Sequence, residues 1–346
     1  MGSLPATTPQ PRVPRPGVWC PAVTFFDPAT DTLDLESQKK YLSYLSRTGL
    51  AGLVILGTNA EAFLLTREER AQLIAAAREA VGPDFPLMAG VGAHSTKQTL
   101  ELARDAAAAG ANYLLVLPPA YFGKATTVSV VKRFFADVAR EAPLPVVIYN
   151  FPGVCNGVDI DSDTITAIVR DSAAANAASN KTNDDGKSNV VGVKLTCASV
   201  GKITRLAATF PSPSEFAIFG GQSDFLVAGL SVGSAGCIAA FANIFPKTVS
   251  RIYDLYTSGK VDQAMEVHRH AALAEAAVKS GIAAVKYAVS VYSAREAGLV
   301  GQKGEGEEKL RPRTPYEEAG EGVKGRVRGK EMREVEGIER GLGVVS

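Results

Sequence analysis

Histidine is scarce in this chain of 346 residues, which contains only three. His268 and His270 stand two apart in a segment with helical spacing and would face different ways, while His94 is far from both in the sequence. A zinc site needs a cluster of such ligands, and these positions do not offer one. We therefore expect no metal, and an enzyme that polarises a carbonyl with this inventory would have to use an amine.

Cysteine is also rare. The four cysteines are far apart and show no CxxC spacing, so neither a disulfide framework nor a zinc site is indicated. We expect small core residues in a reducing compartment at these positions. They are Cys20, Cys155, Cys197 and Cys237.

Net charge and long apolar runs are lacking as well. A formal net charge of +1 provides no general field that would attract nucleic acid or an anionic membrane. No apolar run approaches the ~18 residues that would suggest a membrane span. The predicted partner is therefore a small molecule, with no nucleic acid and no membrane.

The N-terminal segment, residues 1–16, lacks an apolar signal region and acidic residues. Arg12 and Arg15 give it a faint resemblance to a mitochondrial presequence. Its prolines, however, would break the amphipathic helix that such a presequence needs. We predict a disordered arm and a cytoplasmic location.

From residue 17 onward, eight short apolar runs alternate with segments of helical spacing. This alternation predicts a parallel sheet, and eight units predict its closure into a (β/α)8 TIM barrel over residues 17–246. An open doubly wound sheet is the alternative. It normally carries a GxGxxG turn after an early strand, whereas the first runs here are followed by FFDPATD and GTNAEAF.

Three segments stand apart from the alternation. Residues 172–189 contain few bulky apolar residues and indicate a helix end followed by a flexible surface insertion. Residues 247–300 predict a small C-terminal helical extension. Residues 301–346 are charged and nearly devoid of aromatics, so we expect a largely disordered or only marginally helical tail.

The run NVVGVKLT places Lys194 in an otherwise apolar strand. Strand side chains alternate, so Lys194 and Val190 would face the barrel interior, and Val191, Val193 and Leu195 would pack against helices. Strand ends carry the chemistry of such barrels. Burial disfavours the charged form of an amine, and a free amine can attack a carbonyl. The alternative is a lysine whose ammonium reaches solvent at the strand end.

Other strand ends offer groups that could work with this amine. Tyr149 ends PLPVVIYNF and could transfer the protons of imine formation, although a tyrosine there can also be simple packing. Gly57, Thr58 and Asn59 form a turn whose amides and hydroxyl could hold a carboxylate, or a plain loop. Tyr121, in LPPAYFGK, could reach over the barrel mouth.

Together, these motifs resemble a known family. The order GTNAE, PPAYF, YNFPG, GVKLT and GGQSD is similar to that of the dihydrodipicolinate synthase and N-acetylneuraminate lyase family of pyruvate-dependent aldolases, over roughly residues 17–300. The resemblance implies a Schiff base between Lys194 and pyruvate, with no cofactor. Tyr149 would relay protons, and Thr58 and Asn59 would hold the carboxylate.

The resemblance also implies roles that the residues alone do not suggest. Tyr121 matches a tyrosine that reaches into a neighbouring subunit's site, which implies a homotetramer. Gly221 and Ile238 match positions where backbone groups flank the bound ketoacid.

The sequence departs from the family pattern at three places. Asn59 and Ala60 replace a threonine and a glycine, which affects the proton relay. Val154 stands where the synthases have an arginine, in a pattern like YNVPSRTG, and valine cannot bind a carboxylate. The insertion before NVVGVKLT would lie at the bottom of the barrel, away from the chemistry.

We therefore predict a Schiff-base aldolase, a carbon–carbon lyase that cleaves a 4-hydroxy-2-keto acid to pyruvate and an aldehyde. A 2-keto-3-deoxy sugar acid or 4-hydroxy-2-oxoglutarate would be the substrate, and the loop at Val154 would read the aldehyde half. Dihydrodipicolinate synthesis, a ketoacid-binding barrel without turnover and a phosphate-binding isomerase are the alternatives.

Overall fold

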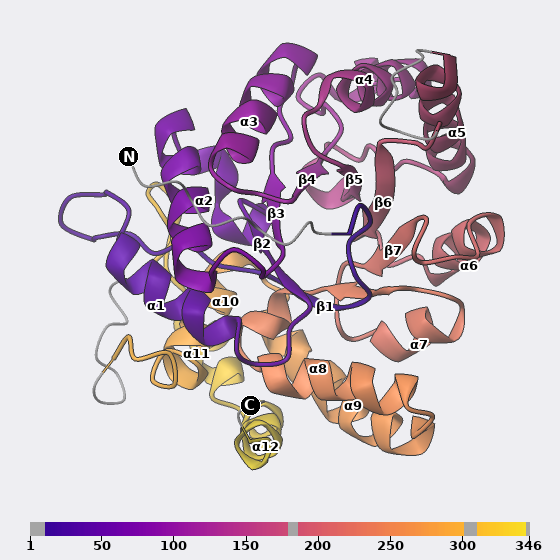
Figure 1. The fold of residues 1–346 in the computed structure, drawn as a ribbon. Coiled ribbons are helices and arrows are strands. Elements are labelled where there is room, and N and C mark those ends of the chain that lie inside the picture. The colour runs from indigo at the N-terminus through magenta and orange to yellow at the C-terminus, as the bar shows by residue number, and fades with distance from the viewer. Residues whose placement is uncertain (1–10, 179–185, 301–309, 344–346) are drawn as a thin grey trace.

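The computed structural model describes residues 11–178, 186–300 and 310–343, and eight of its strands form a closed parallel barrel surrounded by helices (Figure 1). The barrel closes where Trp19 of β1 pairs with Ile238 of β8. The strands are β1 Gly17–Pro21, β2 Gly52–Ile55, β3 Leu87–Gly90, β4 Tyr113–Val116, β5 Val146–Asn150, β6 Val190–Leu195, β7 Ala217–Gly220 and β8 Gly236–Ile238. The predicted (β/α)8 architecture is confirmed.

One helix follows each strand. Local sequence explains their starts: Thr66 and Glu69 form a capping box on α2, and Ser95 caps α3. The helices are α1 Leu35–Leu45, α2 Arg67–Val81, α3 Thr96–Ala108, α4 Val128–Glu141, α5 Ser162–Ala178, α6 Val200–Thr209, α7 Leu226–Ser231 and α8 Pro246–Thr257.

The alternation predicted for β6 is only partly correct. Val193 and Leu195 pack outward against the helices, as expected, and Lys194 faces inward. At the start of the strand the assignment is wrong: Val191 belongs to the cluster inside the barrel and Val190 to the outer one. The pairing with β5 shifts by one residue there, and such a bulge places two residues opposite one and resets the faces.

The described part of the N-terminal arm, residues 11–16, is bound to the barrel, which differs from the predicted disorder. Arg15 Nε donates a hydrogen bond to the carbonyl of Ala51 at 2.7 Å, and Tyr113 Oη donates one to the carbonyl of Pro11 at 2.5 Å. Both partners lie at strand starts, so the segment covers the bottom of the barrel. The rest of the predicted arm lies outside the described residues.

The insertion predicted at residues 172–189 begins as helix, since α5 continues to Ala178. The part predicted to be flexible falls mainly on residues 179–185, outside the described ranges. The chain enters β6 from the bottom of the barrel, so the described residues just before this strand lie at the end opposite Lys194.

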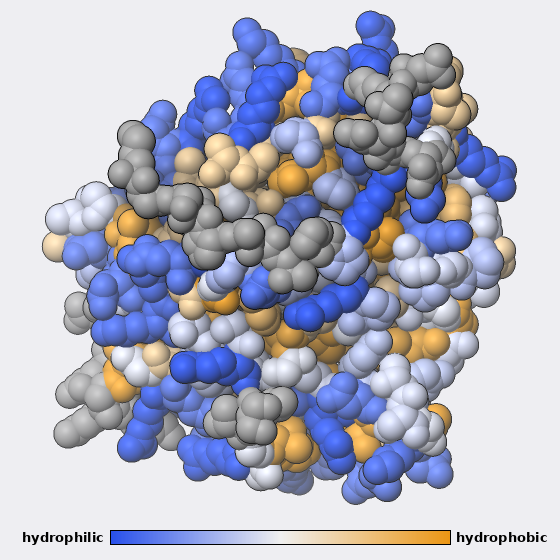
Figure 2. Space-filling view, in the orientation of Figure 1, coloured by the Kyte–Doolittle hydropathy of each residue, from blue (hydrophilic) through white to orange (hydrophobic). Residues whose placement is uncertain are grey.

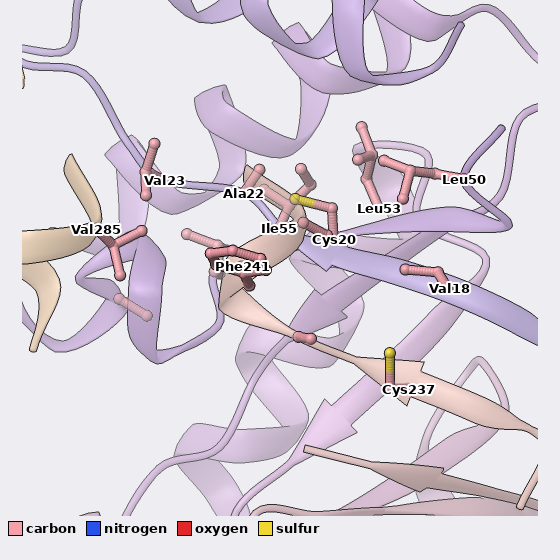
Figure 3. Close-up of a cluster of buried hydrophobic side chains, with 14 of the residues drawn as sticks. Val18, Cys20, Ala22, Val23, Leu50, Leu53, Ile55, Cys237, Phe241 and Val285 are labelled. Carbon is pink, nitrogen blue, oxygen red and sulfur yellow. The ribbon is translucent and has the colours of Figure 1, made fainter. Parts of the chain in front are cut away.

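The helical extension is confirmed, with one change of boundary. The predicted barrel end at residue 246 excludes α8, which nevertheless packs on β1 as the eighth barrel helix. After it come α9, Val261–Glu275, and α10, Ile282–Tyr292. Figure 3 shows Val285 of α10 and Phe241 near Ala22 and Ile55, so the extension and the barrel share one hydrophobic core.

The tail differs from its predicted disorder. Within its described part, residues 310–343, α11 (Glu321–Val327) and α12 (Lys330–Gly341) pack against α10 and α9 (Figure 1). Val327, Met332 and Val335 are fully buried. These apolar residues are too widely spaced among charges to form a recognisable run, and they gain stability only from the surface that α8, α9 and α10 provide.

A buried carboxylate fixes the last helix. Glu339 of α12 accepts hydrogen bonds from the backbone amides of Lys247, at 3.0 Å, and Thr248, at 2.6 Å. These amides lie in the first turn of α8, where they have no partner within the helix. Burial raises the pKa of the Glu339 carboxyl, and the hydrogen bonds oppose that rise. The C-terminal helix thus caps a barrel helix.

Among the described residues, no helix combines the length and apolar character needed to cross a membrane. On the face shown in Figure 2, hydrophilic side chains surround smaller hydrophobic areas.

Candidate active site

Adjacent strands bring Tyr149 and Lys194 together. The two residues are paired between β5 and β6, and Lys194 Nζ lies 4.2 Å from the centroid of the Tyr149 ring. Lys194 is 2% exposed, which contradicts the alternative of an ammonium that reaches solvent. Within the described ranges, no carboxylate forms an ion pair with Lys194. Its amine is therefore available to a molecule that enters the barrel.

The turn after β2 places a hydroxyl beside Tyr149. Thr58 Oγ1 lies 3.3 Å from Tyr149 Oη, within hydrogen-bond distance. Thr58 begins a short 3-10 turn, Thr58–Ala60, which Gly57 precedes and Glu61 ends in the left-handed region at φ 57°. Thr58 and Tyr149 thus form a hydroxyl pair next to the buried amine, as proton transfer requires.

A cavity of about 640 Å³ opens at the carboxyl ends of the strands. Its size suits a small organic ligand. Six of the nine predicted site residues line it: Thr58, Asn59, Tyr149, Val154, Lys194 and Gly221.

The other three predicted residues lie outside the wall of this cavity. Gly57 sits behind the turn that presents Thr58. Ile238 is fully buried inside the barrel, because its side chain packs between strands. Tyr121 is 71% exposed and contacts His94 and Phe122, so it makes no contribution to the cavity of a single chain.

Gly221 occupies a place where no side chain fits. A Cβ atom there would lie 2.1 Å from Thr196 Oγ1 and 2.5 Å from Thr196 Cα. The Gly221 amide donates to the carbonyl of Leu195 at 3.0 Å. The loop after β7 therefore packs directly against the end of β6, beside Lys194.

The sequence reasoning missed a buried carboxylate in the cavity wall. Glu275, at the end of α9, accepts a hydrogen bond at 2.6 Å from Ser223 Oγ and one at 3.3 Å from the Ser223 amide. Burial raises the pKa of Glu275 to about 7, against the opposing effect of the Ser223 hydroxyl. Glu275 thereby holds the loop that contains Gly221. The helical spacing of the sequence did not distinguish Glu275 from other glutamates, which are common on helices.

The raised pKa of Glu275 predicts a pH-dependent stability. The folded carboxyl, with a pKa of about 7 against an ordinary 4.5, holds its proton more tightly than the unfolded chain does. Stability should fall as pH rises from about 4.5 to 7, and Glu275→Gln should remove that fall. Between pH 5 and pH 8, the unfolding free energy of the variant should rise relative to wild type by about 2 to 3 kcal/mol. A difference that stays constant with pH in urea titrations would contradict the assignment.

Residues of the C-terminal tail also line the cavity. Pro312, Tyr316 and Glu317 contribute to its wall, together with Lys279 and Ser280 from the loop before α10. The low apolar content of the tail concealed this role in the sequence.

The fold is a (β/α)8 barrel with a buried amine and a tyrosine at the carboxyl ends of its strands. The model of the Dihydrodipicolinate synthetase family matches residues 15–297, and the chain belongs to this family. The resemblance predicted from the motifs is confirmed.

Curated relatives carry aldolase names. A protein of Coccidioides immitis, provisionally named a mitochondrial 4-hydroxy-2-oxoglutarate aldolase, is 69% identical, with 96% of this chain and 99% of that protein covered. One of Emericella nidulans with the same provisional name is 40% identical over 80% of this chain and 85% of its own. The L-threo-3-deoxy-hexylosonate aldolase of Hypocrea jecorina is 34% identical over 80% of this chain and 86% of its own.

Solved structures agree with the fold. The crystal structure of a dihydrodipicolinate synthase family protein from C. immitis superposes with a TM-score of 0.84 at 65% identity, covering 96% of this chain and 99% of the other. A monomeric dihydrodipicolinate synthase variant superposes with a TM-score of 0.76 at 28% identity, covering 96% and 99%.

The predicted cytoplasmic location is wrong by this comparison, because the relatives from C. immitis and E. nidulans are named mitochondrial. The sequence contains the features that gave the N-terminal segment its resemblance to a presequence. Arg12 and Arg15 occur in an N-terminal segment without acidic residues, and the prediction gave more weight to the helix-breaking prolines.

Proposed function

We propose that this protein, a carbon–carbon lyase of the aldolase type, cleaves a 4-hydroxy-2-keto acid to pyruvate and an aldehyde through an imine on Lys194. One observation carries the proposal: a buried amine without a counter-ion in the described ranges faces a cavity beside a tyrosine and a threonine hydroxyl. An amine in this position can attack the carbonyl of a ketoacid that enters the cavity.

The proposed reaction uses the buried amine as an electron acceptor. The amine of Lys194 adds to C2 of the substrate, and loss of water gives a protonated imine. The C4 hydroxyl then loses its proton, the C3–C4 bond breaks, and its electron pair forms an enamine while the aldehyde leaves. Protonation at C3 and addition of water release pyruvate and regenerate the amine. Tyr149 and Thr58 are placed to transfer these protons.

Residues around the amine are suited to the ketoacid end of the substrate. Thr58 and Asn59, which line the cavity, would hold the carboxylate, and Gly221 would flank the bound ketoacid with its backbone. Val154, which lines the cavity and is 45% exposed, offers no charge to a second carboxylate. This disfavours dihydrodipicolinate synthesis, whose aldehyde substrate the synthases bind with an arginine.

Borohydride trapping tests the proposal. Wild-type protein incubated with pyruvate and then reduced should gain one pyruvate-derived group, which peptide mapping should place on Lys194. The same preparation should release pyruvate from 4-hydroxy-2-oxoglutarate or from a 2-keto-3-deoxy sugar acid. Absence of an adduct would contradict the imine, and an adduct without cleavage of any ketoacid would favour a binding barrel instead.

Tyr149→Phe should separate proton transfer from imine formation. The variant keeps the ring beside Lys194 but loses the hydroxyl, so we expect kcat/KM to fall by roughly 10²- to 10⁴-fold. Slower trapping of pyruvate should still occur on Lys194. Steady-state kinetics and mass spectrometry measure the two effects, with Phe151→Leu as a control that changes an aromatic neighbour without removing a hydroxyl. An unchanged kcat/KM in Tyr149→Phe would show that the Tyr149 hydroxyl takes no part in the reaction.

We further propose a mitochondrial location, supported by the names of the two relatives. A homotetramer in which Tyr121 crosses a subunit contact is supported by its exposure together with Phe122 and Phe63. Sedimentation of the wild type and of Tyr121→Ala would test the assembly.

A further inference from the structure

The cavity has an outer wall formed by the tail. We define residues 310–317 as the C-terminal strap. Three of them, Pro312, Tyr316 and Glu317, line the same cavity as Lys194. Lys194 is 2% exposed and Tyr316 is 63% exposed, so the imine would form at the base of the cavity and the strap lies at its rim.

Two buried charges hold the backbone of the strap. Lys286 and Glu61 form an ion pair of 2.6 Å, with side chains 0% and 1% exposed. Each side chain also forms a hydrogen bond with the backbone of the strap. Lys286 Nζ donates to the carbonyl of Arg311 at 2.7 Å, and Glu61 accepts from the Arg313 amide at 2.7 Å. Since Glu61 ends the turn that presents Thr58, the strap is fastened directly to the catalytic turn.

The side chain of Arg313 provides a second attachment. Its guanidinium donates to both carboxylate oxygens of Glu69, at 2.6 and 2.9 Å, and to the carbonyls of Leu64 and Asp31 at 3.0 and 2.8 Å. It also lies over the ring of Phe26, 5.1 Å from the centroid. These partners come from the loops after β1 and β2 and from the start of α2. A bidentate, partly buried contact of this kind fixes the orientation of the guanidinium and also contributes interaction energy.

We propose that the C-terminal strap selects the aldehyde half of the substrate, with Tyr316 and Glu317 as contacting residues and Arg313 as a positioning residue. The inference rests on the proposed function, because an imine at Lys194 places C1 to C3 at the base and everything beyond C4 toward the rim. Glu317 lines the cavity, and its carboxylate forms no ion pair within the described residues. It accepts hydrogen bonds from hydroxyl groups and repels a second carboxylate. The strap therefore favours hydroxylated substrates, such as 2-keto-3-deoxy sugar acids, over the dicarboxylate 4-hydroxy-2-oxoglutarate.

Charge removal at the rim tests the contact. Glu317→Gln in the full-length protein should raise the ratio of kcat/KM for 4-hydroxy-2-oxoglutarate to that for a 2-keto-3-deoxy sugar acid by about fivefold, the effect of two unit charges about 4 Å apart in water. Glu318→Gln is the matched control, since Glu318 pairs with Arg311 outside the cavity. An equal shift in both variants, or no shift in Glu317→Gln, would overturn the proposal.

Release of the strap tests the positioning role. Arg313→Ala should raise the KM for 4-hydroxy-2-oxoglutarate and for the 2-keto-3-deoxy sugar acid by about tenfold or more, as expected for loss of a desolvated charge contact. Borohydride trapping of pyruvate alone should stay within about twofold of the wild type. Arg340→Ala, which removes an exposed tail arginine paired with Glu336, should change neither. Equal losses of trapping and cleavage would assign Arg313 to stability alone and overturn its selective role. If Arg313→Ala fails to fold, Glu317→Gln, a substitution at an exposed position, still tests the proposal. A wild type without any pyruvate adduct would instead contradict the proposed function.

Discussion

Replacement of Lys194 by methionine is expected to abolish both pyruvate trapping and cleavage while leaving the protein folded. Loss of the amine removes the imine itself, so the decrease in kcat/KM should exceed the ~10⁴-fold upper end for loss of a general acid or base. Methionine has a similar volume and suits the apolar surroundings. The lost contact with the Tyr149 ring is offset by removal of a buried amine, and the unfolding free energy should change by no more than about 1 kcal/mol.

Mass spectrometry after borohydride reduction, pyruvate-release assays and urea unfolding measure these three quantities on one preparation. Trapping of pyruvate on another lysine of the variant would show that Lys194 is not the imine-forming residue. Retained cleavage without any adduct would point to a reaction that does not pass through an imine.

The same substitution at a second buried lysine, Lys286→Met, is expected to lower the stability of the protein. It would leave the carboxylate of Glu61 buried without its partner, at a cost of about 3 to 5 kcal/mol. Burial lowers the pKa of Lys286, and the adjacent Glu61 opposes this effect and favours the charged form. Loss of the bond to the Arg311 carbonyl should also loosen the C-terminal strap.

Urea unfolding of three variants separates these causes. Lys39→Met, which removes an exposed pair with Glu79, should cost no more than about 1 kcal/mol. The double variant Glu61→Gln with Lys286→Met should regain part of the loss, since no unpaired charge remains. Equal small losses at Lys286 and Lys39 would mean that the buried pair adds nothing to stability.

The site was predictable where strand periodicity applies. Lys194 and Tyr149 end adjacent strands, and closure of the barrel places consecutive strand ends side by side. The prediction failed for Val190 and Val191, because one extra residue at a bulge reverses the faces of a strand. A bulge depends on the pairing with β5, which the sequence of β6 alone does not specify.

The sequence by itself determined the barrel, the buried amine and its tyrosine partner, since these follow from local alternation of apolar residues and from the order of the motifs. Only the tertiary structure decided the outer half of the site. Glu275 lines the cavity from a helix, and Pro312, Tyr316 and Glu317 line it from a charged tail. The strap is held by Lys286 and Arg313, whose partners Glu61 and Glu69 are distant in the chain. A charged residue becomes a structural element only when the fold supplies its counter-charge and removes water, and sequence periodicity records neither event.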